Sequence, residues 1–175
     1  MPGELSPHGR ELAAELGARR RDDRVALVLS SDLRRATETA EIAFGATGIP
    51  VLLDWRLREC DYGDLTGGSA KRVAAVVKDH LEQPYPGGES YSDVVARMRS
   101  FLDDLFLRWD GKRVLVVGHA ATRWSLQHLV DGEPLDDVVG APFEWQPGWE
   151  YAVRPDRVAR RDVGRRTRHS TSAAG

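Results

Sequence analysis

The chain has 175 residues, of which 41% are hydrophobic and 30% charged, as is typical of one globular domain with or without a tail. Its 25 Lys and Arg nearly balance its 27 Asp and Glu, and the net charge of −2 argues against a dedicated nucleic-acid-binding protein. A single cysteine, Cys60, excludes an internal disulfide and a cysteine metal cluster, and no apolar run approaches the ~20 residues that span a membrane.

A helix and a strand–helix unit are predicted at the start of the chain. Ser6 and Pro7 indicate a helix start, because serine caps a helix well and proline fits its first turn. Gly17 is expected at or near the end of this helix. Residues 25–29 form a continuous apolar run typical of a strand buried on both faces, and a helix over residues 32–44 follows at once.

One more strand and two helices are predicted in the middle of the chain. Residues 49–53 predict the second strand, and residues 54–69 predict a loop because they are rich in charge and glycine. Residues 71–81 carry valines on one face and indicate a short helix. A long helix capped by Ser90 or Ser92 is expected next, because its apolar residues recur at helical spacing.

The clearest strand signal covers residues 114–117 and ends in Gly118-His119. A helix to Leu129 is expected after it, and residues 151–153 suggest a final edge strand. Helices that alternate with buried strands indicate an α/β layered fold with a mostly parallel sheet.

The C-terminal segment differs in charge from the rest of the chain. Residues 154–175 carry seven Arg and two Asp, whereas the preceding residues carry 18 basic and 25 acidic groups. Because apolar periodicity also ends there, residues 1–153 are expected to form the domain and residues 154–175 a disordered basic tail. The lone cysteine and the lack of an apolar signal core in residues 1–10 indicate a cytoplasmic protein.

Two candidates for chemistry follow predicted strands, where ligands bind in a parallel sheet. His119 is the only one of the five histidines at such a strand end, and Gly118 before it permits close backbone approach. Arg35 lies in the first turns of a helix, where free N–H groups and a guanidinium favour an anion. The competing interpretation is that Arg34 and Arg35 only solvate the helix and pair with Glu38.

Glu59 is the third candidate, because a carboxylate among other acids can have a raised pKa and donate a proton. Its alternative is an ordinary acidic surface loop. Arg123 follows His119 by one helical turn and either assists phosphate binding or pairs with an acid of the body.

Five collinear segments resemble motifs of the histidine phosphatase superfamily, whose members include the phosphoglycerate mutases. They are residues 5–11 (Leu-Ser-Pro-His-Gly-Arg-Glu), 31–40 (Ser-Asp-Leu-Arg-Arg-Ala, then Thr-Ala), 57–63 (Leu-Arg-Glu-Cys-Asp-Tyr-Gly), 87–91 (Gly-Gly-Glu-Ser-Tyr) and 116–119 (Val-Val-Gly-His). The resemblance covers roughly residues 4–130 and implies a three-layer α/β/α, phosphoglycerate mutase-like fold. The tryptophans at 145 and 149 fall where the family has late loops, so they are expected to pack there, with a role at the substrate mouth left open.

The resemblance implies a phosphatase that works through a phosphohistidine intermediate on a small phosphorylated substrate. Arg35 would bind the phosphoryl group, His119 would be the second histidine that stabilises the transferring group, and Glu59 would give a proton to the leaving alcohol. No metal or organic cofactor is implied, since phosphoryl transfer depends on positioning and on charged hydrogen-bond donors. A phosphatase is favoured over a mutase, because residues 60–84 contain no insertion rich in Lys and Arg.

One family motif has no counterpart in the sequence. The nucleophilic histidine lies in an Arg-His-Gly motif at the end of a first strand, and residues 1–4 cannot supply a strand, which is typically about 5–6 residues long. His8 matches a position inside the following helix instead. We therefore expect that the chain alone does not turn over, either because an upstream segment holds the nucleophile or because it is a phosphate-binding pseudoenzyme or regulatory module. A missing first strand would leave sheet edges exposed and favour self-association.

Overall fold

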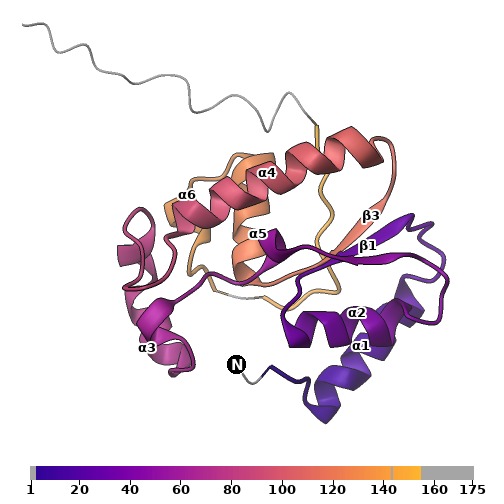
Figure 1. The fold of residues 1–175 in the computed structure, drawn as a ribbon, viewed down its shortest axis with the longest axis horizontal. Helices are drawn as coiled ribbons and strands as arrows, with labels where there is room; N and C mark the ends of the chain where they lie inside the picture. Colours follow the sequence, from indigo (N-terminus) through magenta and orange to yellow (C-terminus); the bar gives the residue numbers. More distant parts are fainter. Residues whose placement is uncertain (1–2, 143, 155–175) are drawn as a thin grey trace, which may run out of the picture.

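A three-stranded parallel sheet lies at the centre of the computed structural model, which describes residues 3–142 and 144–154 (Figure 1). Strand β1 (Leu27–Ser30) lies between β2 (Val51–Leu53) and β3 (Val114–Val117). The register places Val28 beside Val51 on one edge and beside Leu115 on the other. Because β1 has a neighbour on each edge and helices on both faces, all of its residues are buried.

The helices form a layer on each face of this sheet. They are α1 (Pro7–Arg19), α2 (Arg34–Phe44), α3 (Ala70–Val76), α4 (Tyr91–Trp109), α5 (Ala120–Leu126) and α6 (Leu135–Val138). Helices α1 and α2 cover one face, and α4 and α5 cover the other (Figure 1). The predicted α/β class with a parallel sheet and three layers is therefore confirmed.

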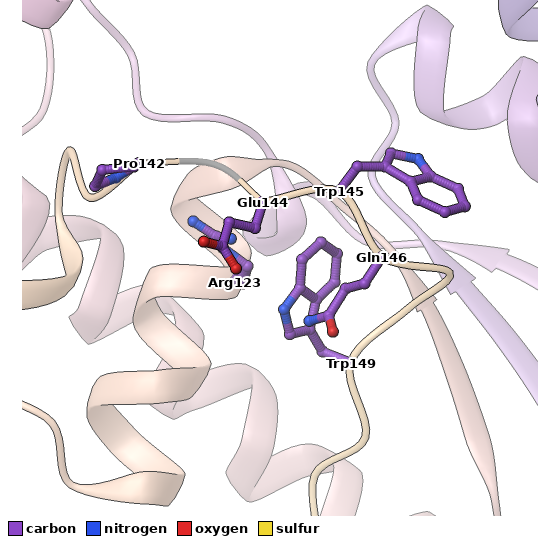
Figure 2. Close-up of a pocket in the computed structure, with 6 residues that line it drawn as sticks. All are labelled: Arg123, Pro142, Glu144, Trp145, Gln146 and Trp149. Carbon is purple, nitrogen blue, oxygen red and sulfur yellow. The ribbon is translucent and has the colours of Figure 1, made fainter.

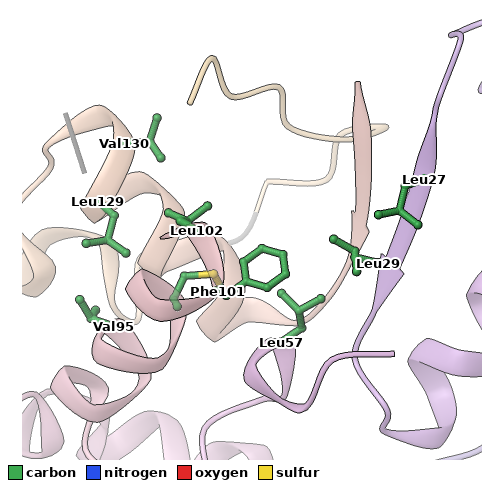
Figure 3. Packing of buried hydrophobic residues seen from close by; sticks show 9 residues of the cluster. Leu27, Leu29, Leu57, Val95, Phe101, Leu102, Leu129 and Val130 are labelled. Atoms are coloured by element: carbon green, nitrogen blue, oxygen red, sulfur yellow. The ribbon is translucent and has the colours of Figure 1, made fainter. Parts of the chain in front are cut away.

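Alternation along β1 divides the core between the two layers. Val28 packs with Ala40 and Phe44 of α2, whereas Leu27 and Leu29 pack in a cluster with residues of α4 (Figure 3). That second cluster also contains Leu57, Val95, Met98, Phe101, Leu102, Leu129 and Val130. Both helix layers thus stabilise the sheet by burying apolar side chains. The loops that carry polar residues follow the carboxyl ends of the strands.

Most predicted elements occur, with shifted ends. The strand over 114–117 is confirmed as predicted, whereas β1 and β2 begin two residues after their predicted starts. The helix expected over 71–81 is α-helical only to Val76 and continues as a 3-10 turn, Val77–His80. The helix predicted to end at Leu129 is α-helical to Leu126 and continues as a π-helical turn, Gln127–Asp131.

The expected edge strand at residues 151–153 is wrong, since the backbone there forms no strand. Tyr151 and Val153 do pack against the core cluster of α4, so their apolar character serves side-chain packing without strand pairing. Helix α6 was not predicted, because four residues are too few to show helical periodicity. The predicted tail lies outside the described residues except for Arg154. Among the described helices, none has the length and apolar character that crossing a membrane requires.

Gly17 lies near the end of the first helix, as predicted, and the helix continues to Arg19. Its role is close packing, because a Cβ at this position would lie 2.3 Å from the carbonyl oxygen of Ala43 in α2. The predicted cap is confirmed at the other end, where the Ser6 hydroxyl accepts a hydrogen bond from the Gly9 N–H at 3.1 Å.

Replacing Gly17 with alanine is expected to lower the free energy of unfolding by about 1–3 kcal/mol, because the two helices must separate. Urea denaturation measures this. Gly9→Ala is the matched control on the same helix, since its Cβ would meet the flexible side chain of Leu5 at 3.2 Å. Equal stability of the two variants would contradict the close-packing role.

Candidate active site

Loops after two strands meet at the carboxyl edge of the sheet. Ser31 follows β1, and His119 follows β3 as the cap residue of α5. The Thr122 hydroxyl accepts from the His119 N–H at 3.1 Å and donates to the Leu57 carbonyl at 3.0 Å. Gly118 makes this possible, because a Cβ there would lie 2.6 Å from the same hydroxyl.

The imidazole of His119 contacts Arg35, a predicted site residue, and also Ser31. Its Nδ1 lies 3.0 Å from Nη2 of Arg35, and its Nε2 lies 2.9 Å from the Ser31 hydroxyl. A guanidinium can only donate, so Nδ1 must accept and the proton of the neutral ring must sit on Nε2. The ring therefore donates to Ser31, and the contact with Arg35 fixes the tautomer.

Burial lowers the pKa of His119 to about 4, with further lowering by the positive charges of Arg35 and Arg97 and an opposing effect of Asp32. The ring is therefore neutral at pH 7. A site with this ring and a neighbouring guanidinium presents positive charge and N–H donors toward an anion.

This pKa predicts how stability changes with pH. Below pH 6.5 His119 becomes protonated in the unfolded chain, whereas in the folded chain it stays neutral down to about pH 4. The free energy of unfolding therefore falls as the pH drops from 6.5 to about 4. The loss is expected to be at most about 3 kcal/mol. Urea denaturation from pH 7 to pH 4 should show a smaller decline for His119→Gln than for the unaltered chain. Equal declines would show that the ring does not titrate in this way.

Glu59 reaches the same edge from the loop after β2. Its Oε1 accepts hydrogen bonds from the Cys60 N–H at 3.0 Å and from the Ala121 N–H at 3.2 Å. Ala121 lies in the first turn of α5, where a carboxylate is favoured by the free N–H groups. The structure thus brings Glu59 to the helix that His119 caps.

An ion pair ties this loop to the loop after β1. Arg58 donates to both carboxylate oxygens of Asp32, at 2.7 and 2.6 Å. These hydrogen bonds hold the pKa of Asp32 below its usual value. The two loops that flank Arg35 and Glu59 are therefore joined beside the site.

Arg97 is a site residue that sequence reasoning missed. This buried side chain of α4 donates to both carboxylate oxygens of Glu89, at 2.9 and 3.1 Å. It also donates to the carbonyl oxygens of Arg56 and Glu59, the latter at 3.1 Å. The available signal was an arginine on the apolar face of the long helix, next to Met98.

Glu89 and Arg97 together form a clamp on the loop that carries Glu59. Oε2 of Glu89 accepts from the Asp61 N–H at 3.1 Å, and its own N–H donates to the Asp61 carbonyl at 2.9 Å. Gly88 must lack a side chain for this pairing, because a Cβ would lie 2.2 Å from the Asp61 oxygen. The Gly-Gly-Glu-Ser segment thus pairs with the loop at Asp61, and Arg97 binds the carbonyl groups of the same loop.

Cys60 lies beneath this loop and does not offer a nucleophile. Its side chain is buried in a cluster with Tyr85, Tyr91 and Trp124. Burial raises the pKa of the Cys60 thiol far above its usual value, helped by the nearby charges of Glu89 and other acids. A buried thiol that stays protonated is a poor nucleophile at neutral pH.

A pocket of about 260 Å³ opens beside the start of α5 (Figure 2). It is lined by Arg123, Pro142, Glu144, Trp145, Gln146 and Trp149. The guanidinium of Arg123 lies 5.2 Å from the centre of the Trp149 ring, a cation–π contact. The two roles expected for Arg123 were phosphate binding and pairing with an acid. This contact with an aromatic ring is neither of them.

In the part of the chain that the structure describes, no three His, Cys, Asp or Glu side chains are grouped to hold a metal ion. What the site presents is a guanidinium, a neutral imidazole and a carboxylate at the carboxyl edge of a parallel sheet. Fold and site together define an α/β protein whose strand-end site offers an arginine fork beside a neutral imidazole and a carboxylate.

Residues 3–144 match the histidine phosphatase superfamily (branch 1), and the chain belongs to this family. It is 34% identical over 140 residues to a probable phosphoglycerate mutase GpmB of Erwinia tasmaniensis, covering 75% of this chain and 65% of that protein. The chain thus spans slightly less than two thirds of that relative.

Two solved structures are similar in fold as well as sequence. YhfR of Bacillus stearothermophilus superimposes with a TM-score of 0.70 at 31% identity, covering 82% of this chain and 75% of that one. The mycobacterial glucosyl-3-phosphoglycerate phosphatase Rv2419c superimposes with a TM-score of 0.66 at 29% identity, covering 77% and 71%. The similarity to these structures agrees with the predicted phosphoglycerate mutase-like fold.

Proposed function

We propose that the strand-end site binds the phosphoryl group of small phosphate monoesters and belongs to a phosphatase of such esters. The observation that carries this proposal is the contact of Arg35 with His119 at the start of α2, where free N–H groups add to the positive charge. A phosphatase is favoured over a mutase because a similar structure is a phosphatase by name and residues 60–84 hold no insertion rich in Lys and Arg.

In the proposed reaction each residue has one role. A histidine nitrogen attacks phosphorus, the bond from phosphorus to the ester oxygen breaks, and Glu59 gives its proton to the departing alcohol. Water then attacks the phosphohistidine and gives a proton back to Glu59, and the bond from phosphorus to nitrogen breaks to release phosphate. Arg35 and His119 hold the phosphoryl oxygens throughout. Both N–H donors bind Oε1 of Glu59, so Oε2 is the oxygen proposed to carry the proton.

The attacking histidine is proposed to come from outside these residues. Among the described histidines other than His119, His8 is exposed and contacts Glu11, His80 stacks on Tyr85, and Nδ1 of His128 lies 2.7 Å from the Glu133 carbonyl oxygen. None of the three follows a strand as His119 does. We propose that the 175 residues bind phosphate esters and do not hydrolyse them alone. The second candidate function is a non-catalytic phosphate-binding or regulatory module. It rests on the same positions of the described histidines.

Calorimetry with inorganic phosphate and an assay with p-nitrophenyl phosphate test these statements on the 175-residue chain. Phosphate binding without hydrolysis is expected. Failure to bind phosphate would remove the proposed site, and steady turnover would show that the histidines of the 175-residue chain suffice. Adding a peptide with an Arg-His-Gly strand separates the two candidates, since only the phosphatase would gain activity.

Self-association is proposed from the edges of the sheet. Within the described residues β3 pairs only with β1, and each of its four residues is partly exposed. An unpaired strand edge offers N–H and carbonyl groups to another chain. Sedimentation equilibrium is expected to show an average mass that rises with concentration, and a monomer throughout would contradict this. We also propose a cytoplasmic location, because Cys60 is a free thiol.

A further inference from the structure

The hydroxyl of Ser31 contacts the ring nitrogen of His119 that Arg35 leaves free. Its Oγ lies 2.9 Å from Nε2 and also accepts a hydrogen bond from the Leu33 N–H at 3.2 Å. Because Arg35 keeps the ring proton on Nε2, both lone pairs of Oγ are used and only the hydroxyl proton is left to donate. Ser31 is fully buried, and its side chain makes no other hydrogen bond with the described residues. The unliganded site thus buries an O–H donor without an acceptor, which is costly.

The side of His119 that faces Arg35 has the wrong polarity for an anion. Nδ1 of the neutral ring presents a lone pair, which accepts from Nη2 of Arg35 at 3.0 Å. A phosphoryl group that binds the guanidinium removes this donor and brings a negative oxygen atom toward the lone pair. His119 can donate to that oxygen atom only if Nδ1 carries a proton. The ring must therefore take up a proton or exchange its tautomer when the anion binds.

The surroundings of His119 favour the exchange of tautomer. Burial and the positive charges of Arg35 and Arg97 lower the pKa of the ring to about 4, and Asp32 opposes them only in part. At pH 8 the protonated ring of the unliganded site is therefore about 10⁴-fold less populated than the neutral ring. A neutral ring with its proton on Nδ1 adds no charge to this environment. Its Nε2 also offers the Ser31 hydroxyl the acceptor that it lacks.

We propose that Ser31 is a positioning residue that lets the neutral His119 ring change tautomer when a phosphoryl group binds. In the unliganded site Nε2–H donates to Oγ of Ser31. In the occupied site the Ser31 O–H donates to Nε2, Oγ still accepts from Leu33, and Nδ1–H donates to a phosphoryl oxygen beside Arg35. Water takes the proton from Nε2 and supplies the one at Nδ1, so the charge of the ring stays zero. A hydroxyl suits this role because it both accepts and donates. The inference rests on the proposed function, since the phosphoryl group is what draws Arg35 away from the ring.

Nitrogen NMR on the 175-residue chain with isotope-labelled histidine tests the proposal at pH 8, because the shifts of the two ring nitrogens distinguish both neutral tautomers and the charged ring. The His119 signals are identified by their absence in His119→Gln. Without phosphate the proton is expected on Nε2, and with saturating inorganic phosphate on Nδ1. A ring that keeps its proton on Nε2, or that carries protons on both nitrogens, would overturn the proposal.

Ser31→Ala is expected to weaken phosphate binding about tenfold at pH 8, because Nε2 of the occupied site loses its donor. The signal of the neutral ring protonated on Nδ1 should also disappear from the phosphate-bound spectrum. Ser30→Ala is the matched control, since Ser30 is equally buried but donates to the Ser31 carbonyl and not to the imidazole. This control should change the affinity less than about twofold and keep the tautomer exchange. Equal effects of both variants on affinity and spectrum would contradict the role of Ser31.

The same measurements separate this inference from the proposed function. If phosphate does not bind the unaltered chain, the phosphate site is wrong and the tautomer exchange falls with it. If phosphate binds and Arg35→Ala weakens it, while the ring proton stays on Nε2, the phosphate site stands and only the role of Ser31 is wrong.

Discussion

Replacing Arg35 with alanine is expected to weaken the binding of inorganic phosphate about 10- to 100-fold. The change removes the guanidinium that lies 3.0 Å from Nδ1 of His119, and charge-assisted hydrogen bonds contribute about 1.5–3 kcal/mol. It also removes a positive charge that lowers the pKa of His119, so the ring of the variant should titrate at a higher pH. Calorimetry measures the affinity, and NMR titration of the imidazole measures the pKa.

Arg34→Ala is the matched control for this variant. Arg34 is the neighbouring arginine on the same helix, but its exposed side chain pairs with Glu4 and Glu38. Its loss is expected to change phosphate affinity less than about twofold, because exposed ion pairs contribute little. Equal weakening by both variants would show that general positive charge, and not the position of Arg35, attracts the anion. Arg35→Lys should recover only part of the affinity, because lysine lacks the planar fork.

Replacing Arg97 with alanine is expected to lower the free energy of unfolding by about 3 kcal/mol, near the lower end of values for a broken buried ion pair. The lower end applies because Glu89 keeps 28% of its side chain exposed and can regain water. The carbonyl groups of Arg56 and Glu59 would also lose a donor. Urea denaturation at pH 7 measures the loss.

Two comparisons test whether this loss comes from the clamp. Arg108→Ala removes an exposed arginine of the same helix and is expected to change stability by less than about 0.5 kcal/mol. The double variant Arg97→Ala/Glu89→Ala should cost less than the two single changes added together, because each single change leaves a charge unpaired. Additive losses would mean that the two side chains stabilise the fold independently.

The sheet could be predicted from the sequence because its strands are continuous apolar runs that end in short polar turns. Residues 114–117 were placed without error for this reason, since Gly118 and His119 stop the run sharply. Residues 151–153 show the limit of the same signal. Tyr151 and Val153 are apolar because they pack against the core, and nothing local distinguishes that from strand pairing.

The candidate site could be predicted only in part. Strand-end positions pointed to His119 and Arg35, but their contact joins residues 84 positions apart and depends on the pairing of β1 with β3. Arg97 was missed because its partners lie 8, 38 and 41 positions away, in two other segments of the chain. An arginine on an apolar helix face indicates a buried partner without saying which one.

The clamp made by Arg97 holds the loop that carries Glu59 through backbone oxygen atoms. Two of its donors go to the carbonyl groups of residues 56 and 59, so the contact is indifferent to the side chains at those positions. A mutation at position 59 would remove the acid at the sheet edge and its hydrogen bond with the Ala121 N–H, whereas the hydrogen bonds of Arg97 to the loop backbone would remain. In this chain, the acid at the sheet edge and the Arg97 contacts that hold the loop backbone are therefore specified by different atoms.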